Sequence, residues 1–467
     1  MHALDETIAA IATAPGAAGL AVVRVSGTAA LAVSGAVFRG ATPLAAADGH
    51  TLHHGWAVWP EREHERIDEV VAAVFRAPRS YTREDVVEFS CHGGAHIARC
   101  LLEALITAGA RLARPGEFTL RAFLSGRLDL AQAEAVADLI HAETAAAREL
   151  ALGQLAGALS RRLGEIEESV VSLAAEVEAR VDFAEDVGGV EVPPSVVAGI
   201  ESADAALAAL LERSDYARAV REGVRVPLIG RPNVGKSSLF NALVGEERAI
   251  VTPIPGTTRD RVSEQVEIAG IPVTLSDTAG LRDSADTVES LGIERTRAAM
   301  TESPLVLWVV DRSAALTELD RALARELAGR RILIALNKSD RPALASRAMI
   351  ETWLDGAPLR IAEVSALTGA GLDTLRAGLA ALLGGGAARA EGALTAGALA
   401  ASNARHVEAL SRARAALGRA REVAGRAPGE IVALELREAL AGIAEVTGRT
   451  AGEELLDRIF ERFCIGK

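Results

Sequence analysis

Aromatic residues and cysteines are scarce in this chain. Phe, Trp and Tyr together make up 3% of the residues, so Leu, Ala, Val and Ile must build most of any core. The three cysteines, Cys91, Cys100 and Cys464, have no metal-site spacing, and their odd number leaves one unpaired. This usage excludes a disulfide-stapled secreted domain and favours a reducing compartment.

Basic charge and long apolar runs are also lacking. A net charge of −13 excludes a bulk nucleic-acid binder, so any RNA contact must come from a local basic patch. No apolar run reaches the roughly 18 residues of a membrane span, and the first residues lack the basic and apolar regions of a secretory signal. We therefore expect a cytoplasmic protein with no membrane segment.

The chain is long enough for several domains. Its 467 residues predict about three at 100–200 residues per domain. Residues 1–120 alternate short apolar runs with turns, with strands expected over 20–27 and 67–75 and a helix over 94–110. This pattern predicts an α+β domain.

Two further regions are predicted to be helical, at residues 121–220 and 385–467. The stretch 130–181 is Ala/Leu-rich and free of proline, and a second helix follows to about residue 220. Each region carries an apolar stripe that needs a partner. We therefore expect the two regions to pack together as one α-helical domain.

Residues 221–384 between them alternate apolar runs with helical stretches. This order predicts an inserted α/β domain with a mainly parallel sheet covered on both faces. The expected strands are 224–229, 272–277, 304–311 and 331–338.

The first of these strands is followed by a phosphate-binding motif. Residues 230–237 match G-x-x-x-x-G-K-[ST] between a strand and a helix, a layout in which backbone N–H groups surround phosphate oxygens. Lys236 is expected to reach the β- and γ-phosphates and to assist catalysis, while the Ser237 hydroxyl ligates Mg²⁺. The predicted contacts are Gly230, Asn233, Val234, Gly235, Lys236, Ser237 and Ser238.

A guanine-reading motif follows the fourth strand as N-K-x-D, residues 337–340. The Asp340 carboxylate can accept hydrogen bonds from the N1–H and exocyclic amine of guanine, a donor pair that adenine lacks. Asn337 is expected to support the loop, and the Lys338 stem to cover the ring. Ser365, Ala366 and Leu367 would supply a backbone N–H for the guanine carbonyl.

Two segments between these motifs have the pattern of nucleotide switches. Asp277, Thr278, Ala279 and Gly280 end the second strand, where Asp277 would hold Mg²⁺ through water and Gly280 would sense the γ-phosphate. The G-T-T-R-D segment 256–260 precedes it, with Thr258 as the expected second Mg²⁺ ligand. Thr252, Gly256 and Thr257 are included among the predicted GTP contacts. In this order, the motifs predict a Ras-like P-loop G domain.

The residue after Gly280 is Leu281, where Ras-like proteins place a water-orienting Gln. Leucine cannot orient water, so catalysis must come from another group or be slow. Glu289, in an acidic stretch, is the candidate; the alternative is a solvated loop carboxylate.

At full length the chain resembles the MnmE (TrmE) family of tRNA-modification GTPases. The resemblance lies in VVRVSG, EDVVEFSCHGG, RPGEFTLRAFLSGRLDLAQAEA, GTTRD and the terminal FCIGK. It implies a homodimer formed by an N-terminal domain that resembles folate-binding domains and holds a 5-formyl- or methylene-tetrahydrofolate. By motif, Arg24, Glu88, Arg127 and Lys467 would contact the folate.

The resemblance also implies K⁺-dependent dimerisation of the G domains, which activates hydrolysis. Asn233, Thr252, Ile254 and Thr257 would coordinate K⁺, and Glu289 would orient the attacking water through a second water. Cys464 is either a reactive thiol or a packed small side chain at a helix end. Cys91 and Cys100 are expected in the core, and His92 at a turn rather than in the folate pocket.

The implied function is modification of tRNA. With a separate FAD-dependent partner, MnmG (GidA), members add a carboxymethylaminomethyl-type group to C5 of the wobble uridine, using a carbon from tetrahydrofolate. A ribosome-assembly GTPase of the Era or EngA type is the alternative, since it shares the P-loop and GTTRD. A non-catalytic scaffold is a second one, against which the intact motif residues argue.

One basic pattern could serve RNA binding. Arg405, Arg412, Arg419 and Arg426 recur every seven residues on one predicted helix, which keeps them near one face. They are either a tRNA-phosphate stripe or a solvated face with ion pairs along the helix.

Overall fold

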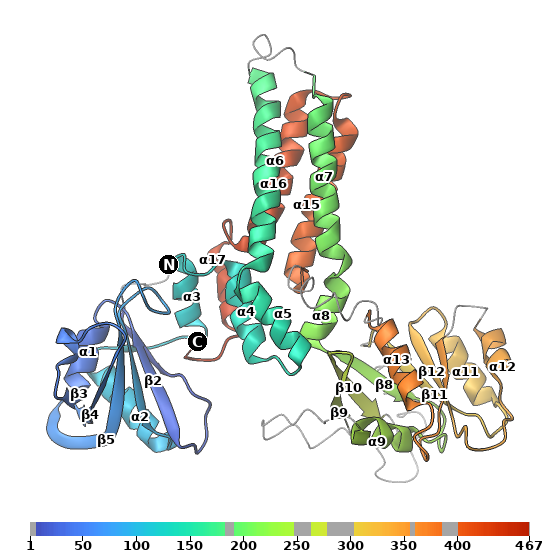
Figure 1. The fold of residues 1–467 in the computed structure, drawn as a ribbon, viewed down its shortest axis with the longest axis horizontal. Coiled ribbons are helices and arrows are strands. Elements are labelled where there is room, and N and C mark those ends of the chain that lie inside the picture. Colours follow the sequence, from blue (N-terminus) through green and yellow to red (C-terminus); the bar gives the residue numbers. More distant parts are fainter. Residues whose placement is uncertain are drawn as a thin grey trace. The chain divides into compact units, whose positions relative to one another are not determined.

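The computed structural model describes residues 6–182, 191–246, 263–277, 303–354, 360–384 and 400–466. The chain divides into two compact units (Figure 1). Unit 1 comprises Met1–Ala137 and Leu440–Lys467, and unit 2 comprises Asp138–Ala439. Unit 1 contains the N-terminal α+β domain, and unit 2 contains the helical and α/β parts, so three architectures occur in the order that the sequence predicts.

Unit 1 is built on a seven-stranded sheet of order β3-β4-β5-β6-β2-β1-β7. Neighbouring strands are antiparallel except for the parallel pair β1–β7. Helices α1 and α2 pack on it through a core that includes Val23, Phe89 and Leu101. The strands are β1 (Ile8–Ile11), β2 (Leu20–Ser26), β3 (Phe38–Gly40), β4 (Thr51–Trp59), β5 (Arg62–Phe75), β6 (Val86–His92) and β7 (Arg111–Leu112), and the helices are α1 (Ala30–Val37), η1 (Leu44–Ala46) and α2 (Ala95–Thr107).

The C-terminal segment is part of unit 1. Helices α3 (Glu117–Leu124) and α17 (Glu453–Phe460) meet in an apolar cluster that includes Leu120, Phe460 and Phe463. This packing brings the chain end back to the sheet, where Gly466 reaches Arg24 on β2.

The helical part of unit 2 confirms the expected pairing of distant segments. Helix α7 packs along α15, and Asp204 on α7 accepts a hydrogen bond of 2.9 Å from Arg414 on α15. The helices are α5 (Ala145–Leu155), α6 (Ala158–Asp182), α7 (Pro194–Glu212), α8 (Ser214–Glu222), α15 (Ala404–Val423) and α16 (Gly429–Thr447).

The helical stretch expected over 130–181 is three helices. Helix α4 (Leu130–Ile140) ends before Thr144, whose hydroxyl caps α5 by accepting from Ala147 N. Gly157, with φ of 79°, separates α5 from α6. Capping residues and a left-handed glycine divide a continuous apolar pattern.

One described segment, Pro194–Glu222, is long and apolar enough to cross a membrane by length and composition alone. The sequence alone predicts no such segment. Val196, Ile200, Ala203 and Leu207 on α7 are buried, and α7 packs against α6 and α15. These contacts are those of a core helix in a bundle.

The α/β part has a six-stranded sheet of order β13-β12-β11-β8-β10-β9. Among the described strands, the pair β9–β10 is antiparallel and the other neighbouring pairs are parallel. Helices α9 and α13 cover one face and α11 and α12 the other, as the sequence predicts. The elements are β8 (Val224–Ile229), α9 (Lys236–Glu246), β9 (Ser263–Ile268), β10 (Ile271–Asp277), β11 (Val306–Asp311), α11 (Glu318–Leu327), β12 (Ile332–Asn337), α12 (Arg347–Trp353), β13 (Arg360–Glu363) and α13 (Leu372–Leu382).

Candidate functional site

The phosphate-binding loop runs between β8 and α9. Gly230, Asn233 and Gly235 have φ of 149°, 63° and 97°, all in the left-handed range. A Cβ on Gly235 would overlap the Asn337 side chain, and one on Gly230 would overlap Val309 O. Glycine is therefore required at both positions, and the loop curls as a cradle for phosphate oxygens.

Lys236 lies across this loop. Its Nζ donates to Gly230 O at 2.8 Å and to Arg231 O at 3.0 Å, and 6% of the residue is exposed. The ammonium is thereby held at the phosphate cradle. Ser237 and Ser238 lie exposed in the first turn of α9, where a hydroxyl suits the Mg²⁺ ligand of a bound nucleotide.

Asn337 joins the phosphate loop to the base-binding loops. It is buried at the end of β12, and its Nδ2 donates to Val234 O at 2.9 Å. Its Oδ1 accepts from Ala366 N at 3.0 Å. The structure thus brings together Val234, Asn337 and Ala366, which the sequence places in three separate motifs.

Lys338 is fixed by two acceptors. Its Nζ donates to Asn233 O at 2.9 Å and to Asp311 Oδ2 at 2.6 Å. Burial raises the pKa of Asp311, but hydrogen bonds from Lys338 and Ser313 outweigh it and the net pKa is lowered. Asp311 therefore stays ionised and orients Lys338. Sequence reasoning missed Asp311, although it ends a strand at the edge where parallel strands place ligands.

Asp340 is held in its charged form. Its Oδ1 accepts from the buried Ser365 Oγ at 2.6 Å, and this hydrogen bond is the main cause of its lowered pKa. A fixed carboxylate can accept from the two adjacent N–H donors of guanine. Leu367, two residues after Ser365, is 82% exposed rather than in the core.

Several predicted residues lie outside the described part of the chain. Asp277 ends β10, paired in register with Leu228 of β8, and its side chain is not described. The other predicted residues outside the described ranges are Thr252, Ile254, Gly256, Thr257, Thr258, Thr278, Ala279, Gly280, Glu289 and Lys467.

A second cluster lies in unit 1, where β2 and β6 place Arg24 opposite Glu88. Arg24 Nε donates to Glu88 Oε1 at 2.7 Å, and Arg24 Nη1 donates to Gly466 O at 3.3 Å. The Arg24 Cζ lies 5.4 Å from the ring centroids of both Tyr81 and Phe118. A cation, a carboxylate and aromatic faces at one place suit a flat heteroaromatic ligand.

Arg127 adjoins the same cluster through Tyr81. Its Cζ lies 4.7 Å from the Tyr81 ring centroid, and its Nη1 donates to Tyr81 O at 3.1 Å. The structure therefore brings together Arg24, Glu88 and Arg127. Gly466, which precedes Lys467 in the sequence, also reaches this cluster. Sequence reasoning missed Tyr81 and Phe118, since no local pattern marks an aromatic side chain that packs on a distant arginine.

The cysteines differ in environment. Burial raises the pKa of Cys91 to about 11, which fits its expected place in the core. Cys100 is half-buried, with Sγ 3.6 Å from His96 Nε2. Cys464 is exposed, so the packed alternative does not hold and the reactive thiol stays a prediction. His92 ends β6 and contacts Asp68 through Nδ1 at 2.7 Å.

The arginine pattern does not form one stripe. Arg405, Arg412 and Arg419 lie on α15, but this helix ends at Val423. The prediction that Arg426 lies on it is wrong, because Gly425 takes a φ of 75° and stops the helix. Arg419 is paired with Glu435 and Glu438 of α16 at 2.7 and 3.1 Å, so its ion pairs run to the neighbouring helix and not along α15 as the alternative expected.

Comparison with known proteins places the chain in one family. Residues 130–464 match the family model of the MnmE helical domain, and residues 7–127 match that of the GTP-binding protein TrmE N-terminus. Three relatives, each called tRNA modification GTPase MnmE, are similar over 99% of this chain and their entire length. They come from Symbiobacterium thermophilum (49% identical), Chloroflexus aurantiacus (45%) and Heliobacterium modesticaldum (44%). The chain therefore belongs to the MnmE family of tRNA modification GTPases and is a GTP hydrolase.

Proposed function

We propose that this cytoplasmic chain couples GTP hydrolysis to the addition of a carboxymethylaminomethyl-type group at C5 of the tRNA wobble uridine. The observation that carries the proposal is the base-binding frame around Asn337, in which Asp340 is held as a charged acceptor by Ser365. An ionised carboxylate at this place can accept hydrogen bonds from both N–H groups of guanine. With adenine bound, the same carboxylate would face a lone pair instead of a donor. GTP, rather than ATP, is the nucleotide that this frame fits.

The carbon donor is proposed to be a tetrahydrofolate derivative bound in unit 1. The Glu88 carboxylate can accept hydrogen bonds from the amide-like N–H and the amine on the edge of a pterin ring. Asp340 can accept hydrogen bonds from guanine in the same way. Arg24 lies within cation–π distance of two aromatic rings and would hold the head group against them. When bound, the folate supplies a one-carbon unit; the chain's own residues bind and orient it.

Hydrolysis is proposed to depend on K⁺ and on pairing of two G domains. Asn233, at the tip of the phosphate loop, has an exposed side chain with a φ of 63°, so a neutral amide oxygen is available to a large cation. Thr252, Ile254 and Thr257 would complete the K⁺ site, Ser237 and Thr258 would hold Mg²⁺, and Glu289 would orient the water.

Partners are proposed from the same family relation. A homodimer formed by unit 1, an FAD-dependent MnmG-type protein and tRNA would make up the working complex. The ribosome-assembly alternative loses ground, because the two family models match residues 7–127 and 130–464.

Reconstitution tests the proposal. The protein would be mixed with the FAD-dependent partner of the same genome, unmodified tRNA, a methylene-tetrahydrofolate and an amine donor, and nucleosides would be read by mass spectrometry. We expect C5-modified wobble uridine with GTP and none with ATP. The Asp340→Asn variant should modify tRNA with xanthosine triphosphate instead, because an amide can donate to the xanthine oxygen. Robust GTP hydrolysis without any modified uridine would overturn the proposal.

A further inference from the structure

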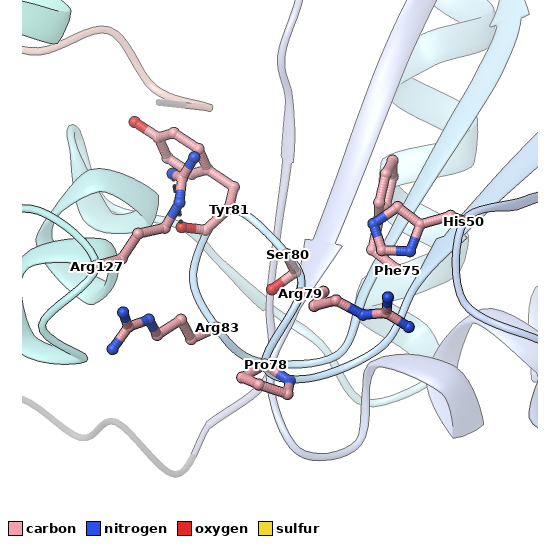
Figure 2. A pocket seen from close by; sticks show the side chains of 8 residues that line it. All are labelled: His50, Phe75, Pro78, Arg79, Ser80, Tyr81, Arg83 and Arg127. Carbon is pink, nitrogen blue, oxygen red and sulfur yellow. Dashed lines mark hydrogen bonds between the residues drawn. The ribbon is translucent and has the colours of Figure 1, made fainter. Parts of the chain in front are cut away.

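An open cavity of about 460 Å³ lies beside Tyr81 in unit 1 (Figure 2). The segment between β5 and β6 supplies most of its wall, and Arg127 closes one side. Figure 2 shows Arg127 against Tyr81, while Arg79 and His50 approach from the other end. The lining residues are His50, Phe75, Pro78, Arg79, Ser80, Tyr81, Arg83 and Arg127.

The cavity is cationic. Arg79, Arg83 and Arg127 line it together with His50, and none of the lining residues is Asp or Glu. Arg83 donates to Ser125 O at 2.9 Å and Arg127 to Tyr81 O. Among the described residues, none of the three guanidinium groups is paired with a carboxylate.

Several other arginines of the same unit are paired with carboxylates. Arg24 is bound to Glu88, Arg111 to Glu117 and Arg121 to Glu84, each at 3.0 Å or less. In a chain with net charge −13, three guanidinium groups around one cavity, none with a carboxylate partner among the described residues, suit a ligand that brings its own negative charges.

The wall of the cavity is preformed. Thr82 is buried and its Oγ1 lies 2.7 Å from Ser26 Oγ. Ala77 N donates to Asp85 Oδ1 at 2.9 Å, and Tyr81 OH lies 2.9 Å from Thr119 Oγ1. These bonds fix the backbone that carries Arg79 and Arg83, so a ligand would have to order the exposed arginine side chains but not the wall itself.

The cavity adjoins the Arg24 cluster at Tyr81, which lines the cavity and whose ring lies 5.4 Å from Arg24 Cζ and 4.7 Å from Arg127 Cζ. We propose that it binds the γ-linked glutamate tail of a folate-class cofactor whose head lies at Arg24 and Glu88. The inference rests on the folate part of the proposed function. Guanidinium groups suit carboxylates through paired hydrogen bonds, and the polar lining suits a charged chain rather than a flat ring.

An RNA backbone would bring the same kind of charge. The size of the cavity matches a small-molecule site, and its link to Arg24 through one tyrosine favours the cofactor tail. RNA binding at this place is therefore an outcome of the test rather than the proposal.

Calorimetry with two probes tests the inference on the full-length protein. The probes are 5-formyltetrahydrofolate with one glutamate and the same compound with five. We expect the pentaglutamate to bind about 10-fold more tightly, since its added carboxylates would make two or three weak charge-assisted contacts with exposed guanidinium groups. The affinity difference between the two probes should shrink at high salt, because salt screens contacts between exposed charges.

The double variant Arg79→Gln/Arg83→Gln should bind both probes equally, with the monoglutamate affinity unchanged. That unchanged affinity also shows that the fold is intact. The single variant Arg79→Glu, which changes a side chain with no described partner, should by itself reduce the affinity gain of the pentaglutamate over the monoglutamate. Arg62→Gln, an exposed arginine of the same unit paired with Glu65, is the matched control and should keep the full gain.

The outcomes separate the two claims. Equal binding of both probes by the wild-type protein overturns the tail site and leaves the folate proposal intact. A tail gain that persists in the double variant also overturns it, as does a selective loss of tRNA affinity with no change for either folate. Failure of the wild-type protein to bind the monoglutamate overturns the folate part of the proposed function and this inference with it.

Discussion

Asn337 donates a hydrogen bond of 2.9 Å to the carbonyl of Val234, so the strand that reads the base is tied to the loop that binds phosphate. The two residues are 103 positions apart. The same amide accepts from Ala366 N. One buried side chain therefore sets the distance between the phosphate and guanine sites, which a rigid nucleotide requires.

Asn337→Ala should weaken GTP binding by about 10- to 100-fold, because it removes two buried hydrogen bonds and leaves Val234 O without this donor. Titration with a fluorescent guanine nucleotide measures the effect. Asn403→Ala is the control, since Asn403 caps α15 and its loss affects helix stability rather than the nucleotide site. Equal affinities for Asn337→Ala and the wild-type protein would refute this role.

Four of the six described strands of the α/β part match the expected runs closely, but β9 and β13 were not among the expected strands. The run expected over 224–229 is β8, and the run expected over 331–338 contains β12. Buried parallel strands are short continuous apolar runs, so their signal is local. The ends of helices are harder to predict. Helix α15 ends at Val423 because of Gly425, and this single glycine is a weaker sequence signal than the seven-residue repeat of arginines.

The site could be predicted only as motifs. The P-loop and N-K-x-D identify their own residues, but Asp311 and Tyr81 belong to no motif and meet their partners only in the folded chain. The contact between Arg24 and Gly466 spans 442 positions. Such pairs depend on strand register and on the path of the C-terminus, which no local pattern encodes.

Acid should weaken unit 1 through Glu117. This buried carboxylate accepts from Arg111 at 2.7 Å and from Arg121 at 3.1 Å. Burial raises the pKa of Glu117, but these bonds and that from Arg114 N outweigh it and the net pKa lies below 4.5. Its stabilisation is therefore complete above pH 4.5 and is lost as the pH falls through the lowered pKa.

Glu117→Gln should lower the free energy of unfolding by about 3 kcal/mol at pH 7, because Arg121 then loses a buried anionic partner. Urea unfolding at pH 7 and at pH 3 measures the difference between variant and wild type, which should shrink at the lower pH. Glu165→Gln, at an exposed pair with Arg162, should change little. A difference that stays constant with pH would contradict the account.

The cysteines should react with thiol reagents in a fixed order. Cys464 is exposed, whereas Cys91 is 1% exposed with its pKa raised to about 11. Alkylation at pH 8 followed by peptide mass spectrometry should label Cys464 first and Cys91 only after unfolding, since the thiolate is the reactive form. Cys464→Ser should remove the fast phase. Fast labelling of Cys91 in the native protein would show that the core described here opens readily.

The most direct test of the account is the rate of GTP hydrolysis in K⁺ and in Na⁺ buffers, for the wild-type protein and for Glu289→Ala. We predict strong stimulation by K⁺ that Glu289→Ala abolishes while GTP binding is retained, because the cation would stabilise charge between the phosphates and Glu289 would orient the water. Equal slow rates in both salts, with or without Glu289, would contradict it.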